Sequence, residues 1–152
     1  MGASTDRGRP LFLLAAVAAV AIVLDQATKA LAVARLAETA VPLLGGILQL
    51  SLTYNSGSAF GLETPAWVAV GVSVIVCVVI LVYMLRGAGQ TRLRGAALGL
   101  VLGGALGNLG DRLRAGAVID FIDLRVWPVF NVADIAISVG VGLLVLEVVR
   151  RR

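Results

Sequence analysis

The chain has 152 residues, of which 59% are apolar and only 14% charged, and this composition indicates an integral membrane protein that forms a single domain, residues 1–152. The net charge is +4, but the basic residues stand at the ends of apolar runs rather than in a patch, which argues against nucleic acid as a partner. Because the chain has no histidine and one cysteine, a Ser-His-Asp triad, a Cys-His dyad, a histidine zinc site and an internal disulfide are excluded.

The first apolar segment, residues 11–34, covers about 36 Å at ~1.5 Å per residue and can cross a membrane as one helix. A secretory signal peptide is the alternative, since Ala32-Val33-Ala34 resembles a cleavage site. Three further spans and the charged residues Asp25 and Lys29 argue against it. These two residues are four positions apart and share a helix face, so we expect a structural ion pair at the outer end of this span.

Residues 35–65 form the first outer segment and contain a predicted strand. Apolar and polar residues alternate strictly from Leu48 to Asn55, which is typical of a half-buried strand. The stretch from Ser56 to Gly61 consists of small residues apart from Phe60, and it includes Gly57. They favour a tight turn in which Asn55 either presents its amide to a bound peptide or serves the turn alone.

The second and third spans are predicted at residues 66–85 and 95–109. The valine and isoleucine content of the second is strand-like, but an isolated strand cannot satisfy its backbone in lipid, so a helix is expected. The third span has glycines at every fourth position: Gly95, Gly99, Gly103 and Gly107. Such a stripe lets neighbouring helices approach closely, which predicts a central place for this helix in the bundle.

Polar residues gather where the third span is predicted to end and the second outer segment, residues 110–131, begins. Asn108, Asp111 and Arg112 lie within one turn and a half of each other. They can be interfacial residues of no special function, but an amide, an acid and a guanidinium can also bind substrate carbonyls. We favour the functional interpretation.

Two acids, Asp120 and Asp134, flank the start of the fourth span, predicted at residues 132–149. Asn131 has the position of a helix N-cap and Asp134 that of the third helical residue, so Asp134 has an ordinary capping interpretation. If the two carboxyls meet around one water, an ionised one can take its proton while a protonated one polarises a carbonyl. Because the helix dipole favours an anion, we expect Asp134 to be the more acidic partner and Asp120 the more readily protonated. Spacing alone does not separate Asp120 from Asp123.

The positive-inside rule predicts the topology. Eight of the thirteen basic residues fall on the side of both termini, which is therefore expected to be cytoplasmic: Arg7, Arg9, Arg86, Arg92, Arg94, Arg150, Arg151 and Arg152. The predicted strand and the candidate polar residues then lie together at the outer face.

Five ordered motifs, DQATK, YNSGSAFG, GGALGNLGDR, VIDF and FNVAD, resemble those of the bacterial lipoprotein signal peptidases (signal peptidase II). The resemblance covers most of the chain. It implies an intramembrane aspartic endopeptidase of the bacterial cytoplasmic membrane. Such an enzyme removes signal peptides from prolipoproteins at the outer face, before a diacylglyceryl-modified cysteine. It also implies membrane lipid as a partner and no metal or cofactor. We expect a monomer, although the sequence leaves the oligomeric state open.

The motifs imply roles residue by residue. Asp120 and Asp134 match the catalytic pair, which leaves Asp123 without that role. Residues that match the substrate pocket are Asn55, Gly57, Asn108, Arg112 and Asn131. Residues that match supporting positions are Asp25, Lys29 and Asp111. Gly110 departs from the bulkier apolar residue that the family has at this position. The loop between Asp120 and Asp134 is short, so the sequence does not decide how fully the protein covers its substrate.

A membrane protein without enzymatic activity is the competing class. A proton-coupled carrier is expected to place its acids near the middle of the membrane, whereas these acids cluster at one face. A structural four-helix subunit uses its acids for packing and capping, and it tolerates the substitution Asp120→Asn.

Overall fold

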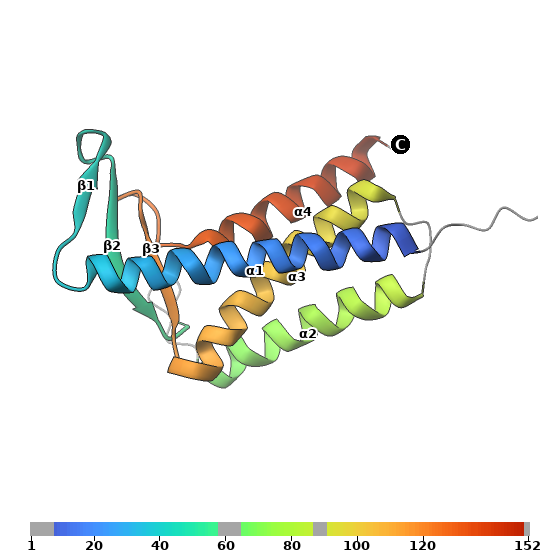
Figure 1. Cartoon of the computed structure of the whole chain (residues 1–152), viewed down its shortest axis with the longest axis horizontal. Helices are drawn as coiled ribbons and strands as arrows, with labels where there is room; N and C mark the ends of the chain where they lie inside the picture. The colour runs from blue at the N-terminus through green and yellow to red at the C-terminus, as the bar shows by residue number, and fades with distance from the viewer. Residues whose placement is uncertain (1–7, 58–64, 87–90, 151–152) are drawn as a thin grey trace, which may run out of the picture.

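The computed structural model describes residues 8–57, 65–86 and 91–150. These residues form four helices that are long and apolar enough to cross a membrane, with a small sheet at one end (Figure 1), so the predicted fold class is confirmed. The helices are α1 (Gly8–Leu36), α2 (Ala66–Leu85), α3 (Arg92–Ala115) and α4 (Val132–Arg150). The strands are β1 (Val41–Leu43), β2 (Leu48–Asn55) and β3 (Val118–Asp123). Residues 58–61 of the predicted turn and the basic residues Arg7, Arg151 and Arg152 lie outside the described residues.

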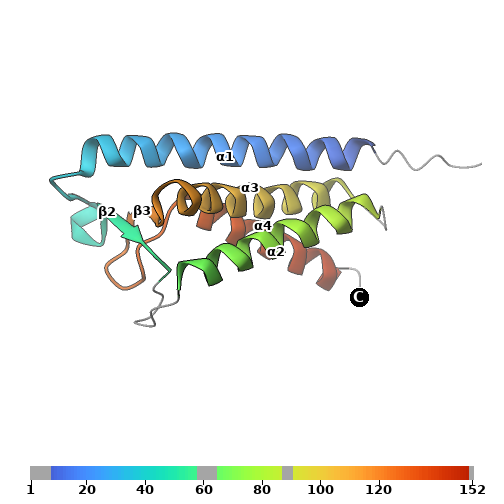
Figure 2. The ribbon, with the colours of Figure 1, turned by 90° about the horizontal axis from the view of Figure 1, so that it is seen from below.

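Helix α3 is the centre of the bundle, as its glycine stripe predicts. It packs against α1, α2 and α4, and Figure 2 shows α1 on one side of it and α2 and α4 on the other. A Cβ atom on Gly99 would lie 2.7 Å from the carbonyl oxygen of Leu14, and one on Gly103 would lie 2.7 Å from that of Ala18. The backbones of α1 and α3 are therefore in direct contact, which only glycine permits.

The predicted end of the third span at residue 109 is wrong. Helix α3 continues through Asp111 and Arg112 to Ala115, and it stops at Gly116, whose φ of 74° is left-handed. The Gly116 N–H donates to the carbonyl oxygen of Arg112 at 3.0 Å, a glycine helix stop. The polar residues thus lie within the helix, where Asn108 and Asp111 find side-chain partners in the bundle.

The three strands form an antiparallel sheet in the order β1-β2-β3. The alternating segment is indeed the half-buried strand β2, and it pairs Thr53 with Asp120 of β3. After β3 the chain turns back, and Phe130 exchanges backbone hydrogen bonds with Ile122 at 2.8 and 3.0 Å. This return places Asn131 and the start of α4 beside β3.

A polar cluster joins three helices at the end of the bundle away from the sheet. Arg94 of α3 donates to Glu147 of α4 at 3.1 Å and to the hydroxyl of Tyr83 of α2 at 2.8 Å. Thr91 caps α3 by accepting from the Arg94 N–H at 3.1 Å and donates to Glu147 at 3.0 Å. The buried Glu147 carboxylate is thereby paired, as a charge beside lipid requires.

The close contact of α1 and α3 predicts opposite effects for two glycine substitutions in one helix. Gly103→Ala forces the backbones apart and should lower the free energy of unfolding by ~1–3 kcal/mol. Gly110→Ala is the matched control, because a Cβ there meets no atom within 4 Å, and the gain in helix propensity should leave stability equal or higher. Thermal unfolding in detergent measures both. Equal melting temperatures for the two variants would contradict the packing described here.

Candidate active site

The Lys29 ammonium lies at the base of the site and is almost fully buried, with 2% of the residue exposed. It forms ion pairs with Asp25 of the same helix at 2.8 Å and with Asp111 of α3 at 2.6 Å. Its third contact is the side-chain oxygen of Asn108 at 2.8 Å. The predicted pair of Asp25 and Lys29 is therefore present, and all three ammonium protons are used.

Gln26 completes this ionic group, a role that the sequence did not reveal. Its amide nitrogen donates to Asp111 at 3.0 Å and to Asp25 at 3.2 Å, and its oxygen accepts from Arg114 at 3.0 Å. The two carboxylates around Lys29 therefore receive additional donors. The position of Gln26 next to Asp25 in the DQATK motif was the available signal.

Two asparagines carry this network to the candidate acids. Asn108 donates to Asp134 at 2.9 Å while its oxygen accepts from Asn131 at 3.1 Å. The same amide nitrogen of Asn131 donates to Asp120 at 2.6 Å, and no part of Asn131 is exposed. The structure therefore brings Asn108, Asn131 and both acids together.

Asp134 fulfils its predicted capping position at the start of α4. The Asp134 N–H donates to the side-chain oxygen of Asn131 at 3.0 Å, and the Asn131 N–H donates back to the Asp134 carboxylate at 3.1 Å. This reciprocal pair is a capping box. Together with Asn108 it gives the carboxylate two N–H donors at the positive end of a helix, an arrangement that suits an anion.

Asp120 lies in β3 and is 2% exposed. Burial raises its pKa to about 6, and the nearby negative charge of Asp134 acts in the same direction, whereas hydrogen bonds from Asn55 and Asn131 oppose the rise. This raised pKa supports the hypothesis that Asp120 is the more readily protonated acid.

Asn55 and Gly57 act as one unit beside Asp120. The Asn55 oxygen accepts from the Gly57 N–H at 2.9 Å, which leaves its amide nitrogen to donate to Asp120 at 3.1 Å. Gly57 has a φ of 118°, a conformation that side chains disfavour. The turn therefore fixes the direction in which the Asn55 amide points.

The remaining candidates differ in their distance from the network. Arg112 lies in the field of Asp134, Asp120 and Asp111, and its buried Nε has no hydrogen-bond partner in the described part of the chain. Asp123 instead accepts from the Arg125 N–H at 2.7 Å. It lies three positions after Asp120 in β3, so the two acids point to opposite faces of the strand.

Two cavities reach the acids. One of about 220 Å³ includes Asp120 and is lined by Thr53, Tyr54, Asn55, Ser56, Pro128 and Val129. The other, of about 370 Å³, includes Asp134. Within the described ranges no three acidic or thiol side chains are placed to hold a metal ion. This arrangement can perform acid–base chemistry on a ligand that lies between the two cavities.

The sequence profile of the family described as signal peptidase (SPase) II matches residues 17–150. The chain belongs to the signal peptidase II family. A lipoprotein signal peptidase of Halalkalibacterium halodurans is 43% identical over 140 residues, covering 88% of this chain and 90% of the relative. One from Moorella thermoacetica is 50% identical over 106 residues, covering 68% and 70%.

The fold is also similar to two solved bacterial membrane enzymes. One, at 2.3 Å resolution, has a TM-score of 0.77 and 25% identity, covering 88% of this chain and 85% of its own. The other, at 1.9 Å, has a TM-score of 0.76 and 26% identity, covering 87% and 89%. The resemblance inferred from the motifs is thus confirmed, and signal peptidases II are proteases. The polar network is the candidate active site of a membrane protease.

The burial of Lys29 predicts a large cost for its removal. Lys29→Met leaves Asp25 and Asp111 as uncompensated carboxylates and should lower the free energy of unfolding by ~3–5 kcal/mol. Arg35→Met in the exposed last turn of the same helix is the matched control and should change stability by less than ~0.5 kcal/mol. Unfolding in detergent followed by circular dichroism measures both. A stable Lys29→Met protein would show that the ionic group does not hold α1 to α3.

Proposed function

We propose that this signal peptidase II is an intramembrane aspartic endopeptidase. It removes signal peptides from prolipoproteins by cutting before a diacylglyceryl-modified cysteine. The observation that carries the proposal is the shared contact of the two acids with Asn131, which accepts from Asp134 and donates to Asp120. Their surroundings differ, since one acid is buried with a raised pKa and the other caps a helix. Because of this difference, we take Asp120 as protonated and Asp134 as ionised in the active enzyme.

The reaction follows from these proton states. Ionised Asp134 takes a proton from a water that attacks the scissile carbonyl, while protonated Asp120 donates a hydrogen bond to the carbonyl oxygen as negative charge develops there. The proton held by the pair then passes to the leaving amine as the C–N bond breaks. Asn108 and Asn131 keep the two carboxyls in place throughout.

Arg112 is the third element of this mechanism. Its buried Nε lacks a partner, and an unpaired N–H donor in a closed site is costly unless a ligand uses it. We assign it to a carbonyl of the bound peptide. Asn55 lines the cavity beside Asp120, and the Gly57 N–H donates to the side-chain oxygen of Asn55. We assign this pair to holding the peptide from the sheet side.

The proposed topology places both termini in the cytoplasm and the site at the outer face of the bacterial cytoplasmic membrane. The start of α1 and the end of α4 lie together at the end of the bundle away from the sheet (Figure 1), which agrees with the charge pattern. Substrate then enters sideways from the lipid. A monomer contains every residue that the mechanism uses.

A proton-coupled carrier is the second candidate, and its acids would have to communicate with both sides of the membrane. Here Asp120 lies in the sheet and Asp134 in the first turn of α4. A structural subunit needs neither a raised carboxyl pKa nor a buried Arg112 Nε without a partner among the described residues. Both alternatives fit the site less well than a protease.

The dyad can be tested with three matched substitutions. Asp120→Asn and Asp134→Asn should each reduce cleavage of a diacylglyceryl-modified precursor in detergent at least ~10³-fold. Each replaces a carboxyl group that must bind or release a proton with an amide that cannot. Asp123→Asn, on the opposite face of β3, should retain activity. Melting temperatures confirm that each variant is folded. Activity that survives in Asp120→Asn but not in Asp123→Asn would transfer the role to Asp123.

The pH dependence follows from the pKa of Asp120. Since protonated Asp120 is required, kcat/KM should fall as the pH rises through about 6, the pKa of this carboxyl in the free enzyme. Asn55→Ala removes a hydrogen bond that favours the ionised form, so the pKa rises and the falling limb should move to higher pH. Steady-state kinetics from pH 4 to about 9 measure this, with apparent values that belong to the pair. A shift to lower pH would contradict the assignment.

A further inference from the structure

The cavity that reaches Asp134 has features that the mechanism does not use. It lies between the segment that follows β3 and the outer face of α4, and we call it the Trp127 pocket. Besides Asp134 it is lined by six uncharged side chains: Leu124, Trp127, Phe130, Ile135, Ser138 and Val139. Five of these are apolar or aromatic. The pocket therefore suits an apolar group bound directly beside a catalytic acid.

Besides Asp134, two side chains of the lining carry a polar group. Trp127 contributes an indole N–H and Ser138 a hydroxyl, and both can donate to carbonyl oxygens. Trp127 is 61% exposed and lies at the end of the bundle, the level at which tryptophan meets the lipid headgroups. An apolar ligand with a few ester carbonyls matches this combination better than a purely hydrocarbon one.

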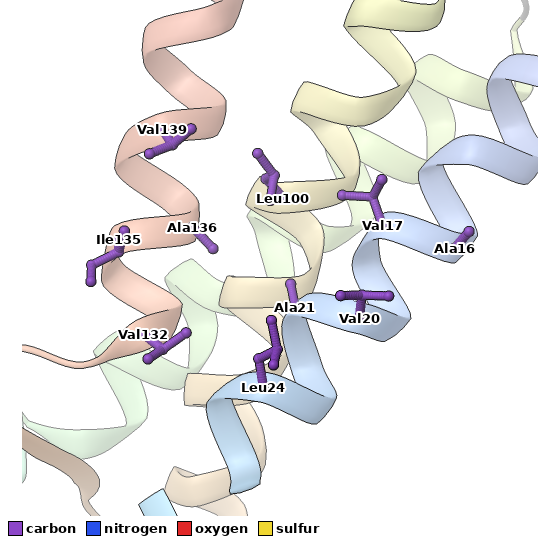
Figure 3. A pocket seen from close by; sticks show the side chains of 10 residues that line it. All are labelled: Ala16, Val17, Val20, Ala21, Leu24, Leu100, Val132, Ile135, Ala136 and Val139. Carbon is purple, nitrogen blue, oxygen red and sulfur yellow. The ribbon is translucent and has the colours of Figure 1, made fainter. Parts of the chain in front are cut away.

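Size and continuity favour a lipid over an amino-acid side chain. About 370 Å³ equals roughly a dozen water volumes of ~30 Å³ each, more than one side chain fills. Two of its residues, Ile135 and Val139, also line an apolar groove of about 390 Å³ between α1 and α4 over Leu100 (Figure 3). An acyl chain can therefore leave the pocket along α4 without meeting a polar group.

The groove excludes a different occupant. A peptide helix has a diameter of ~10 Å or more, whereas α1 and α4 contact each other and both pack on α3. The signal peptide therefore cannot insert between α1 and α4 as a helix, whereas a single acyl chain fits the groove.

We propose that the Trp127 pocket binds the diacylglyceryl group of the cysteine that follows the scissile bond, with its glyceryl esters near Trp127 and Ser138. The proposal rests on the proposed function and names the part of the enzyme that recognises the lipid. Trp127 and Ser138 are then specificity-determining residues. The lipid, held beside Asp134, sets the position of the peptide bond relative to the dyad.

The two products of the reaction provide the test, since each can be added as an inhibitor. One is a short peptide that begins with dipalmitoylglyceryl-cysteine, and the other is the released signal peptide. Trp127→Ala should raise the inhibition constant of the lipopeptide at least tenfold and leave that of the signal peptide within twofold. Ser138→Leu should act in the same direction.

Matched controls exist for both variants. Trp67→Ala changes the other tryptophan, which is 75% exposed on α2, and Ser73→Leu changes a serine of α2 whose hydroxyl bonds its own helix. Both controls should leave the two inhibition constants unchanged. If Trp127→Ala does not fold, Trp127→Phe keeps a ring and removes the N–H, and it should raise the lipopeptide constant about threefold or more.

Each other outcome overturns the proposal. Unchanged lipopeptide inhibition in folded Trp127→Ala means that this tryptophan only contacts the membrane, and a rise for the signal peptide alone assigns the pocket to a peptide side chain. Equal rises for both products indicate general distortion of the site. In all three cases the wild type still cleaves precursor and the proposed function stands. A wild type that does not cleave overturns the proposed function, and this inference with it.

Discussion

The Lys29 ammonium is buried, and the need to satisfy its three protons organises the end of the molecule that carries the sheet. A buried charge of this kind is tolerated only when partners surround it, and the partners come from α1 and α3. One of them, Asn108, passes the constraint on to Asp134 and Asn131. The positions of Asp120 and Asp134 therefore depend on Lys29, although Lys29 contacts neither of them.

Close packing makes this electrostatic arrangement possible. At Gly107 the absence of a side chain leaves room for the Asp25 carboxylate, since a Cβ there would lie 2.6 Å from its oxygen. The other Asp25 oxygen accepts from the Ala133 N–H at 3.0 Å, at the start of α4. Asp25 thus links α1 to α4 through a space that α3 leaves open. The glycines of α3 therefore permit both the backbone contact between α1 and α3 and the burial of the Asp25–Lys29 ion pair.

Much of this arrangement could be predicted from local patterns. Period-two alternation identified β2, the apolar runs identified the spans, and Asn131 and Asp134 had the spacing of a helix start. The end of α3 was mistaken because Gly110 and the polar residues near it look like an interface when their partners are unknown. Gln26 was missed for the same reason, since its two carboxylate contacts join residues 85 positions apart as well as neighbours. Local pattern predicts elements, whereas the pairing of buried polar groups depends on tertiary contacts.

The capping box at the start of α4 has a consequence for how this site can change during evolution. Asp134 closes the first turn of the helix that carries it, so the side chain assigned to the reaction also belongs to the folding of its own support. Under the proposed function, a sequence that lost this acid would lose helix stability together with activity. Asp120 caps no helix; it lies in β3, where burial disfavours its charged form and where it accepts from Asn55 and Asn131. Under the proposed function, the two acids are therefore constrained differently: Asp134 by the reaction and by helix capping together, and Asp120 by the reaction and by its place in the hydrogen-bond network.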